Sequence, residues 1–361
     1  MSLNLGLLNS IIPFIIAFAA VAFFTPYVRL VLLKADITDN PIVSEHSHKK
    51  GTPTMGGLAI ILGMLLILSL YYQNKLVVLT VGLMVVAAVI GLLDDLLGFR
   101  IKEFQKVVKN IYSKPVEIGM IALDPGNEAR IITSKAKEQL NELLNQNKIK
   151  IIREIPIKSE LKESNKILAQ IMVSLFLVVS GAIPTTLSGF YVGFLAIPIT
   201  IVGVVGSINA VNLIDGMDGL ASGILGMASV ACAVFSILTG RLDTSIVFMA
   251  IGGVCFGFLV WNRLPASIFM GDVGSFALGG LYAAAAIMGD VIIFAVVVLA
   301  VPIISVIISL MHRAGIINLA VEPLHHTLNH KGWSETKIVL TYWLATLIIC
   351  LVALYFYHFF R

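Results

Sequence analysis

Charged side chains are scarce in this chain. Only 13% of its 361 residues are Asp, Glu, Lys or Arg, while 58% are hydrophobic and the mean hydropathy is +0.95. Ordinary soluble domains carry about 25% charged residues. The composition therefore excludes a set of soluble domains and predicts a protein that crosses a membrane several times. A cleavable signal peptide is not expected, because the first ten residues hold no Lys or Arg and the apolar run after them is too long.

Cysteine is also rare. The three cysteines, Cys232, Cys255 and Cys350, all lie inside apolar runs and show none of the paired spacings typical of zinc or redox motifs. We interpret them as small core residues.

Long apolar stretches, in contrast, are abundant. A spanning helix needs roughly 20 mostly apolar residues. Ten stretches meet this description: 11–33, 55–72, 76–93, 167–186, 190–208, 219–238, 245–261, 273–289, 291–311 and 338–358. The expected fold class is an all-α polytopic membrane protein, with spans one to three in residues 1–97 and spans four to ten in residues 166–361. An even number of spans places both termini on the same side.

Residues 98–165 interrupt this pattern with a charged insertion. SKAKEQLNELLNQNKIK (134–150) has apolar residues at helical spacing and predicts an amphipathic helix. ARIIT (129–133) and IIREIPI (151–157) are typical of short strands, and DPGN (124–127) of a turn. We expect a small α/β cytoplasmic insertion.

Lysine and arginine are distributed unevenly over the connections between the spans. Apart from the fourteen between Arg100 and Lys166, eight lie on the side of the 34–54 connection and three on the other side. By the positive-inside rule, the 34–54 side is cytoplasmic. We therefore expect a protein of the cell membrane with both termini outside.

Five polar segments fall on the predicted cytoplasmic side and none on the other. They are HSHKKGTPTMGG (46–57), LLDDLLG (92–98), NAVNLIDGMDG (209–219), WNRLPASIFMGDVGS (261–275) and EPLHHTLNHKGWSE (322–335). Helix packing can bring such segments together, which indicates one functional site at the membrane surface. The structural alternatives are helix caps and a polar seam between helices. Asn212, Asp215 and Asp218, three residues apart, are expected along one helix face.

The residue types in these segments favour metal and phosphate chemistry. Asp94, Asp95, Asp215, Asp218 and Asp272 supply hard oxygen ligands, which suit Mg²⁺, with Mn²⁺ as the alternative. Nearby basic residues, Lys49, Lys50, Lys166 and Arg263, suit an anionic substrate. The adjacent pair His325 and His326, with no cysteine nearby, does not favour zinc.

An ion-coupled transporter is a more distant alternative. Its acids are expected near the middle of the membrane, often in paired repeats, whereas the acids here lie at one rim and no repeat is visible. A membrane scaffold would not need five polar segments on one face.

Five segments together resemble one enzyme family. GTPTMGG (51–57), LLDD (92–95), NAVNLIDGMDGLASG (209–223), FMGDVGS (269–275) and PLHHTLNHKGWSETKIV (323–339) resemble the polyprenyl-phosphate N-acetylhexosamine-1-phosphate transferases. The resemblance covers nearly the whole chain except 98–165. It implies a ten-helix membrane enzyme, often dimeric, that transfers a phospho-N-acetylaminosugar from a UDP-sugar to polyprenyl phosphate with Mg²⁺ and releases UMP. No nucleic-acid partner is expected.

The resemblance also implies roles for individual residues. The catalytic candidates are Asp94, Asp95, Asp215, Asp218, His325 and His326. The substrate-binding candidates are Lys49, Lys50, Thr52, Lys166, Asn209, Asn212 and Asn262, the last at a position that reads uracil in the family. The metal-ligand candidates are Asp272, Asp215 and Asp95.

The sequence leaves the donor sugar open. The GWSE segment favours the MraY branch, the phospho-N-acetylmuramoyl-pentapeptide transferases, which use a UDP-sugar-peptide for a cell-wall polymer. Thr327 stands where that branch has a third consecutive histidine, and the insertion is longer than in bacterial relatives. The alternative is a UDP-GlcNAc enzyme that starts a glycolipid or N-glycan on a polyprenyl or dolichyl phosphate.

Overall fold

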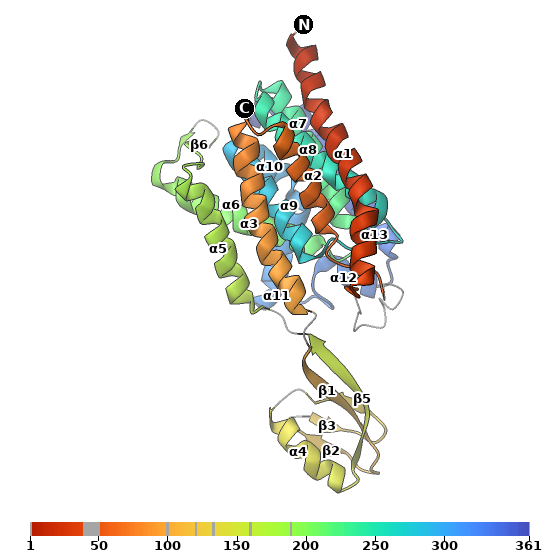
Figure 1. Cartoon of the computed structure of the whole chain (residues 1–361). Coiled ribbons are helices and arrows are strands. Elements are labelled where there is room, and N and C mark those ends of the chain that lie inside the picture. Colours follow the sequence, from red (N-terminus) through yellow and green to blue (C-terminus); the bar gives the residue numbers. More distant parts are fainter. Residues whose placement is uncertain are drawn as a thin grey trace. The chain divides into compact units, whose positions relative to one another are not determined.

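The computed structural model describes residues 2–38, 51–98, 101–119, 121–131, 134–158, 161–187 and 190–360. It forms two compact units (Figure 1). The larger unit contains the chain up to Asp95 and again from Lys162 onward, and it is a bundle of helices. The smaller unit contains Leu96–Leu161 and has both strands and a helix.

The bundle follows the predicted apolar stretches. Its helices are α1 (Ser2–Lys34), α2 (Gly57–Leu70), α3 (Lys75–Gly98), α5 (Glu163–Val179), α6 (Ala196–Ile214), α7 (Leu220–Leu238), α8 (Leu242–Asn262), α9 (Gly271–Met288), α10 (Ile292–Val298), α11 (Ala300–Arg313), α12 (Leu324–His330) and α13 (Glu335–Tyr355). A short hairpin of β6 (Thr186–Leu187) and β7 (Phe190–Tyr191) joins α5 to α6.

The predicted multi-pass membrane architecture is confirmed. Within the described residues, seven helices are long and apolar enough to span a membrane, and α10 with α11 makes an eighth if the bent pair is one span. The remaining two predicted stretches correspond to shorter helices, α2 with 14 residues and α5 with 17. Both ends of the chain lie at the same end of the bundle, as an even number of spans requires (Figure 1).

Helices α7, α8 and α9 form the centre of the bundle. In their most apolar windows 78%, 72% and 83% of residues are buried, against 28% in α1. Side chains such as Phe23 and Leu351 on the outer helices stay exposed, as expected of surfaces that face lipid. Gly253 and Gly257 let α1 approach α8 closely, because a Cβ there would lie 2.4 Å from the Phe14 carbonyl oxygen and 2.6 Å from that of Phe18.

The bend between α10 and α11 has a local cause. The two helices meet at an angle of 74° around Leu299. Pro302 lies in the first turn of α11. In a continuous helix its ring would clash with the carbonyl of Val298, and it offers no N–H to the ladder.

The smaller unit confirms the predicted α/β insertion. It contains β1 (Ile101–Asn110), β2 (Val116–Ile118), β3 (Ile121–Leu123), β4 (Glu128–Arg130), α4 (Ser134–Asn145) and β5 (Ile149–Lys158). The antiparallel sheet has the order β4-β1-β5, and β2 pairs with β3. A separate core forms from residues such as Val108, Leu140 and Ile149. Helix α4 ends earlier than predicted, because the chain turns at Asn147, with a φ of 52°, to start β5.

Candidate active site

Four of the five predicted aspartates line one cavity in the larger unit. The cavity has a volume of about 310 Å³. It is lined by Thr54, Asp95, Asn212, Asp215, Gly216, Met217, Asp218, Asn262, Phe269, Gly271 and Asp272. Four of the five polar segments predicted from the sequence therefore meet here.

Asp95 reaches from the last turns of α3 to the start of α9. Its Oδ1 accepts the backbone N–H of Asp272 at 3.1 Å, and its Oδ2 accepts that of Val273 at 2.9 Å. A carboxylate is favourable at a helix N-terminus, where N–H groups lack partners inside the helix. Gly271, with a φ of 73°, leaves room for this cap, since a Cβ there would lie 2.7 Å from Asp95 Oδ2. Asp95 thus fixes the backbone of Asp272.

Asp94 is buried and paired with a lysine. Its Oδ2 lies 2.5 Å from Nζ of Lys166 in the first turns of α5, and the exposed fraction of its side chain is 4%. The same Nζ lies 3.9 Å from Oδ2 of Asp272. A buried carboxylate is costly without a partner, so Lys166 explains how Asp94 is tolerated at the C-terminal end of a helix. It also brings positive charge beside Asp272.

Asn212 connects α6 to α9. Its Nδ2 donates to Oδ1 of Asp272 at 2.7 Å and to Oγ of Ser275 at 3.0 Å. Asn209 points to a different neighbour, since its Nδ2 donates to Oε1 of Gln170 on α5 at 2.6 Å. Asn209 is not among the residues that line the cavity.

The prediction that Asn212, Asp215 and Asp218 share one helix face is wrong. Helix α6 ends at Ile214, and Asp215 is its C-terminal cap residue. Residues 215–219 form a turn before α7 begins at Leu220. Asp215 has a ψ of 37°, outside the helical range, so the helix ends before it reaches Asp218. Gly219, with a φ of 74° that L-residues with a side chain avoid, then separates the turn from α7. The two aspartates therefore lie on a tight turn at the cavity wall.

Asp218 and Asn262 join this turn to the connection between α8 and α9. Oδ2 of Asp218 accepts the backbone N–H of Ala266 at 2.8 Å. Oδ1 of Asn262 accepts the N–H of Gly219 at 3.1 Å, and its Nδ2 donates to the carbonyl of Ile268 at 3.0 Å. Both side chains are buried and form hydrogen bonds with backbone groups. Both polar atoms of Asn262 already form hydrogen bonds to backbone, so the predicted contact with uracil would have to use the same atoms.

The histidines of α12 lie against the same turn. The ring centroids of His325 and His326 are 4.5 Å apart. A Cβ on Gly216 would lie 2.7 Å from Nε2 of His325 and 2.9 Å from Nε2 of His326, so the two rings meet the turn at this glycine. The absence of a side chain at Gly216 is therefore required for the contact.

Thr327 does not take part in this contact. It is buried, its hydroxyl donates to the carbonyl of Val321, and its Oγ1 accepts the N–H of Val321 at 3.2 Å. The residue that departs from the three-histidine pattern therefore stabilises the chain before α12.

The donor set suits a hard divalent cation that also binds substrate. Within the part of the chain that the structure describes, no three His, Cys, Asp or Glu side chains are grouped as a complete metal site. Mg²⁺ typically uses one or two protein carboxylates and completes its shell with water and substrate phosphates. Asp215 and Asp272 both line the cavity and are compatible with this mode. Both oxygens of Asp95 are already bonded to backbone N–H groups.

Some residues predicted from the sequence do not line the cavity or lie outside the described residues. Lys49 and Lys50 lie outside the described residues. Thr52 is described but does not line the cavity, whereas Thr54 does. Sequence reasoning missed Thr54, Ser275 and Gln170. Ser275 stands inside the FMGDVGS motif, and Gln170 is one turn from Lys166 in an apolar run, so both carried a signal.

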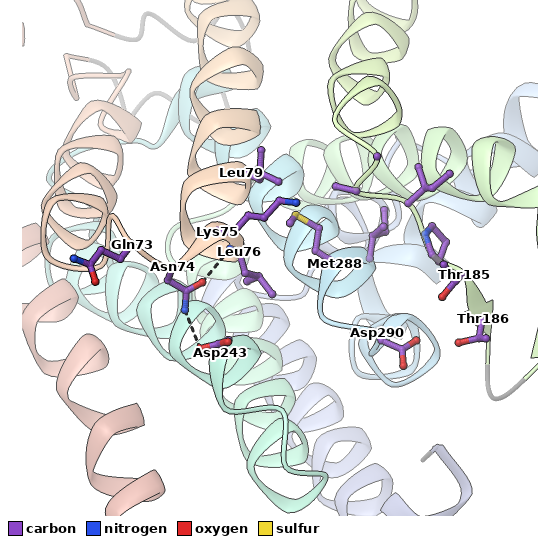
Figure 2. A pocket seen from close by; sticks show the side chains of 15 residues that line it. Gln73, Asn74, Lys75, Leu76, Leu79, Thr185, Thr186, Asp243, Met288 and Asp290 are labelled. Atoms are coloured by element: carbon purple, nitrogen blue, oxygen red, sulfur yellow. Dashed lines mark hydrogen bonds between the residues drawn. The ribbon is translucent and has the colours of Figure 1, made fainter.

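A second cavity, of about 770 Å³, lies at a different place in the bundle. Figure 2 shows Lys75, Asp243 and Asp290 among the side chains that line it. Asn74 Nδ2 donates to Oδ1 of Asp243 at 2.9 Å, and Arg241 pairs with Asp290 at 3.1 Å. None of the predicted site residues lines this cavity.

Comparisons with known proteins identify the family of this chain. The model of glycosyl transferase family 4 matches residues 158–290, and a phospho-N-acetylmuramoyl-pentapeptide-transferase signature matches residues 49–61. A protein of Methanothermobacter thermautotrophicus, whose name assigns it to the phospho-N-acetylmuramoyl-pentapeptide-transferases, is 53% identical over 349 residues, which cover 97% of this chain and 98% of the relative. The phospho-N-acetylmuramoyl-pentapeptide-transferase of Halalkalibacterium halodurans is 32% identical over 97% of this chain and 96% of its own.

The chain belongs to the phospho-N-acetylmuramoyl-pentapeptide transferase family.

As a member of this family, the protein is a phospho-sugar transferase of the multi-pass membrane type. The family-4 match includes Lys166, Asn212, the 215–219 turn and Asp272, which the structure brings together around one cavity. The transporter and scaffold alternatives lose their support with this assignment.

Proposed function

We propose that this transferase moves a phospho-N-acetylaminosugar, carried with a peptide on UDP, to polyprenyl phosphate, and releases UMP with the help of Mg²⁺. The observation that carries the proposal is that α6 and α9 both contribute residues to the acidic cavity and to a separate apolar cavity. A polar phosphate site and an apolar groove on the same two helices suit an acceptor that is both a phosphate and a long hydrocarbon.

The apolar cavity supports a polyprenyl acceptor. It has a volume of about 260 Å³ and lies between α6, α9, α10 and α11. Its lining includes Ala210, two residues before Asn212, and Leu299, where the bent pair α10–α11 breaks. An isoprenoid chain in this cavity would lie along α6 and α9 in the apolar part of the bundle.

The reaction that fits the acidic cavity is a displacement at phosphorus. An oxygen of the acceptor phosphate bonds to the β-phosphorus of the donor, and the bond between that phosphorus and the bridging oxygen breaks, so that UMP leaves. The acceptor needs no strong base, because the second pKa of a phosphate monoester is about 6. Asp94 therefore orients Lys166, and Lys166 offsets the repulsion between the two anionic substrates.

Asp272 and Asp215 are the residues we propose to hold Mg²⁺. Such an ion would supply charge neutralisation for the phosphates. Asn212 orients Asp272 through its 2.7 Å hydrogen bond, and Asp95 fixes its backbone. In this assignment of roles, Asp95 caps the N-terminus of α9 and does not bind the metal.

The donor side of the site is the turn 215–219 with the two histidines. The family assignment supports a UDP-sugar-peptide donor. We also propose that the cavity faces the cytoplasm, that both termini lie outside, and that the enzyme works as a homodimer. The lysine and arginine distribution supports the orientation.

The donor class is tested by UMP release from purified protein in detergent with Mg²⁺ and polyprenyl phosphate. UDP-GlcNAc, UDP-MurNAc and a UDP-MurNAc-peptide are compared. Release with the peptide-bearing donor alone is the expected result. Equal release with plain UDP-GlcNAc would contradict the wall-precursor assignment and favour an enzyme that starts a glycolipid.

A further inference from the structure

The turn 215–219 and the start of α7 contact the C-terminal part of the chain at three points. His325 and His326 meet Gly216. Trp343 on α13 packs against the start of α7, where a Cβ on Gly223 would lie 2.3 Å from Nε1 of its indole. Between these contacts, Glu335 in the first turn of α13 accepts the backbone N–H of Asp218.

Of these three contacts, the one made by Glu335 is a hydrogen bond. Its Oε1 lies 2.8 Å from the backbone nitrogen of Asp218. Asp218 then uses its own Oδ2 to accept the N–H of Ala266, at 2.8 Å. One series of hydrogen bonds therefore links the start of α13, the turn 215–219 and the connection between α8 and α9.

Glu335 is not needed to cap its own helix. Ser334 caps α13, because its side chain accepts the N–H of Lys337 at 3.3 Å. The N-terminal cap of α13 therefore does not depend on the carboxylate of Glu335. The carboxylate also adds negative charge close to Asp215 and Asp218. A neutral acceptor at this position would not add this repulsion.

We propose that Glu335 is a positioning residue of the transfer reaction, which fixes the turn Asp215–Gly219 at the cavity by accepting the Asp218 N–H. It acts through the turn and does not touch the substrates. This inference rests on the proposed function, because the reaction it serves is the transfer from a UDP-linked donor. The donor side of the site depends on the turn, whereas the apolar cavity for the acceptor does not include it.

Two conservative variants separate reach from charge. Glu335→Gln keeps the acceptor at the same distance and removes the charge, while Glu335→Asp keeps the charge and shortens the side chain by one methylene. Thr336→Ala, at the exposed neighbouring position, is the matched control. We expect Glu335→Gln and Thr336→Ala to stay within about threefold of the wild-type kcat/KM for the donor. We expect Glu335→Asp to fall by about ten- to a hundredfold, since displacing a site by about 1 Å costs up to about a hundredfold.

A second readout does not depend on activity. Hydrogen exchange of a peptide that covers 215–219 should be faster in Glu335→Asp than in the wild type and unchanged in Glu335→Gln. The KM for polyprenyl phosphate should stay within about twofold in all variants, because the acceptor groove is elsewhere.

Two results would overturn the proposal. A Glu335→Gln enzyme that is slower than Glu335→Asp would show that the charge itself is used. Wild-type exchange and wild-type kinetics in Glu335→Asp would show that the turn needs no such acceptor. Failure of the wild-type protein to release UMP from any donor would instead contradict the proposed function. The hydrogen-exchange measurement would still show whether Glu335 holds the turn 215–219.

Discussion

The carboxylate of Asp95 accepts the backbone N–H of Asp272 at 3.1 Å, so that a residue near the end of α3 sets the position of the aspartate that we propose as a metal ligand. The neighbouring N–H of Val273 completes this cap. The relationship explains why an acidic pair can stand at the C-terminal end of an apolar helix. One carboxylate is neutralised by Lys166, and the other binds the N-terminus of α9.

Removing this cap should loosen α9 at its start. Asp95→Ala is expected to lower the free energy of unfolding by about 0.5–2 kcal/mol, the usual cost of losing an N-cap side chain. Asp95→Asn keeps one acceptor and should lose less. Thermal unfolding of both variants in the same detergent measures the difference. Equal stability of Asp95→Ala and the wild type would argue that the cap is dispensable.

The pair of Lys166 and Asp94 gives a second prediction. Lys166→Met leaves the buried Asp94 carboxylate without its cation, which typically costs about 3–5 kcal/mol. The double variant Lys166→Met with Asp94→Asn removes the uncompensated charge and should regain most of this stability. Activity should stay low in both, because the charge beside Asp272 is gone. A double variant that is no more stable than Lys166→Met would contradict this account.

The smaller unit should be dispensable for chemistry. It has its own core, and the described residues that line the cavity all belong to the larger unit. Ile101 pairs with Lys158 at the base of the β1–β5 ladder, so a brief polar linker can replace the insertion. A variant with this replacement should keep Mg²⁺-dependent UMP release within about tenfold, in line with the tolerance of surface insertions to change. Complete loss in a bundle that is still folded would make the insertion part of the site.

The sequence predicted the elements better than the contacts between them. Long apolar runs identified the helices, because no other structure satisfies the backbone inside a membrane. The alternation and turn residues of 98–165 likewise indicated its strands. The bend at Leu299 was not predicted, although Pro302 carried the signal.

The site was only partly predictable. The polar segments and the family motifs identified Asp94, Asp215 and Asp272, but not the partner of each residue. The spacing of Asn212, Asp215 and Asp218 suggested a helix face, but α6 ends at Ile214 because Asp215 has a non-helical ψ of 37°. The cap made by Asp95 depends on where α9 begins relative to α3, a matter of tertiary packing between residues 177 positions apart. The bond between Asn209 and Gln170 has the same origin.

The most direct test of the central claim is UMP release by the wild type and by Asp272→Ala, each shown to be folded in detergent. The measurement is made with the UDP-sugar-peptide donor, and with and without Mg²⁺ and polyprenyl phosphate. We predict that the wild type releases UMP only when both are present and that Asp272→Ala is slower by about a hundredfold or more, as expected for the loss of one strong electrostatic contributor. Near-normal release by folded Asp272→Ala, or release that needs no polyprenyl phosphate, would contradict the account.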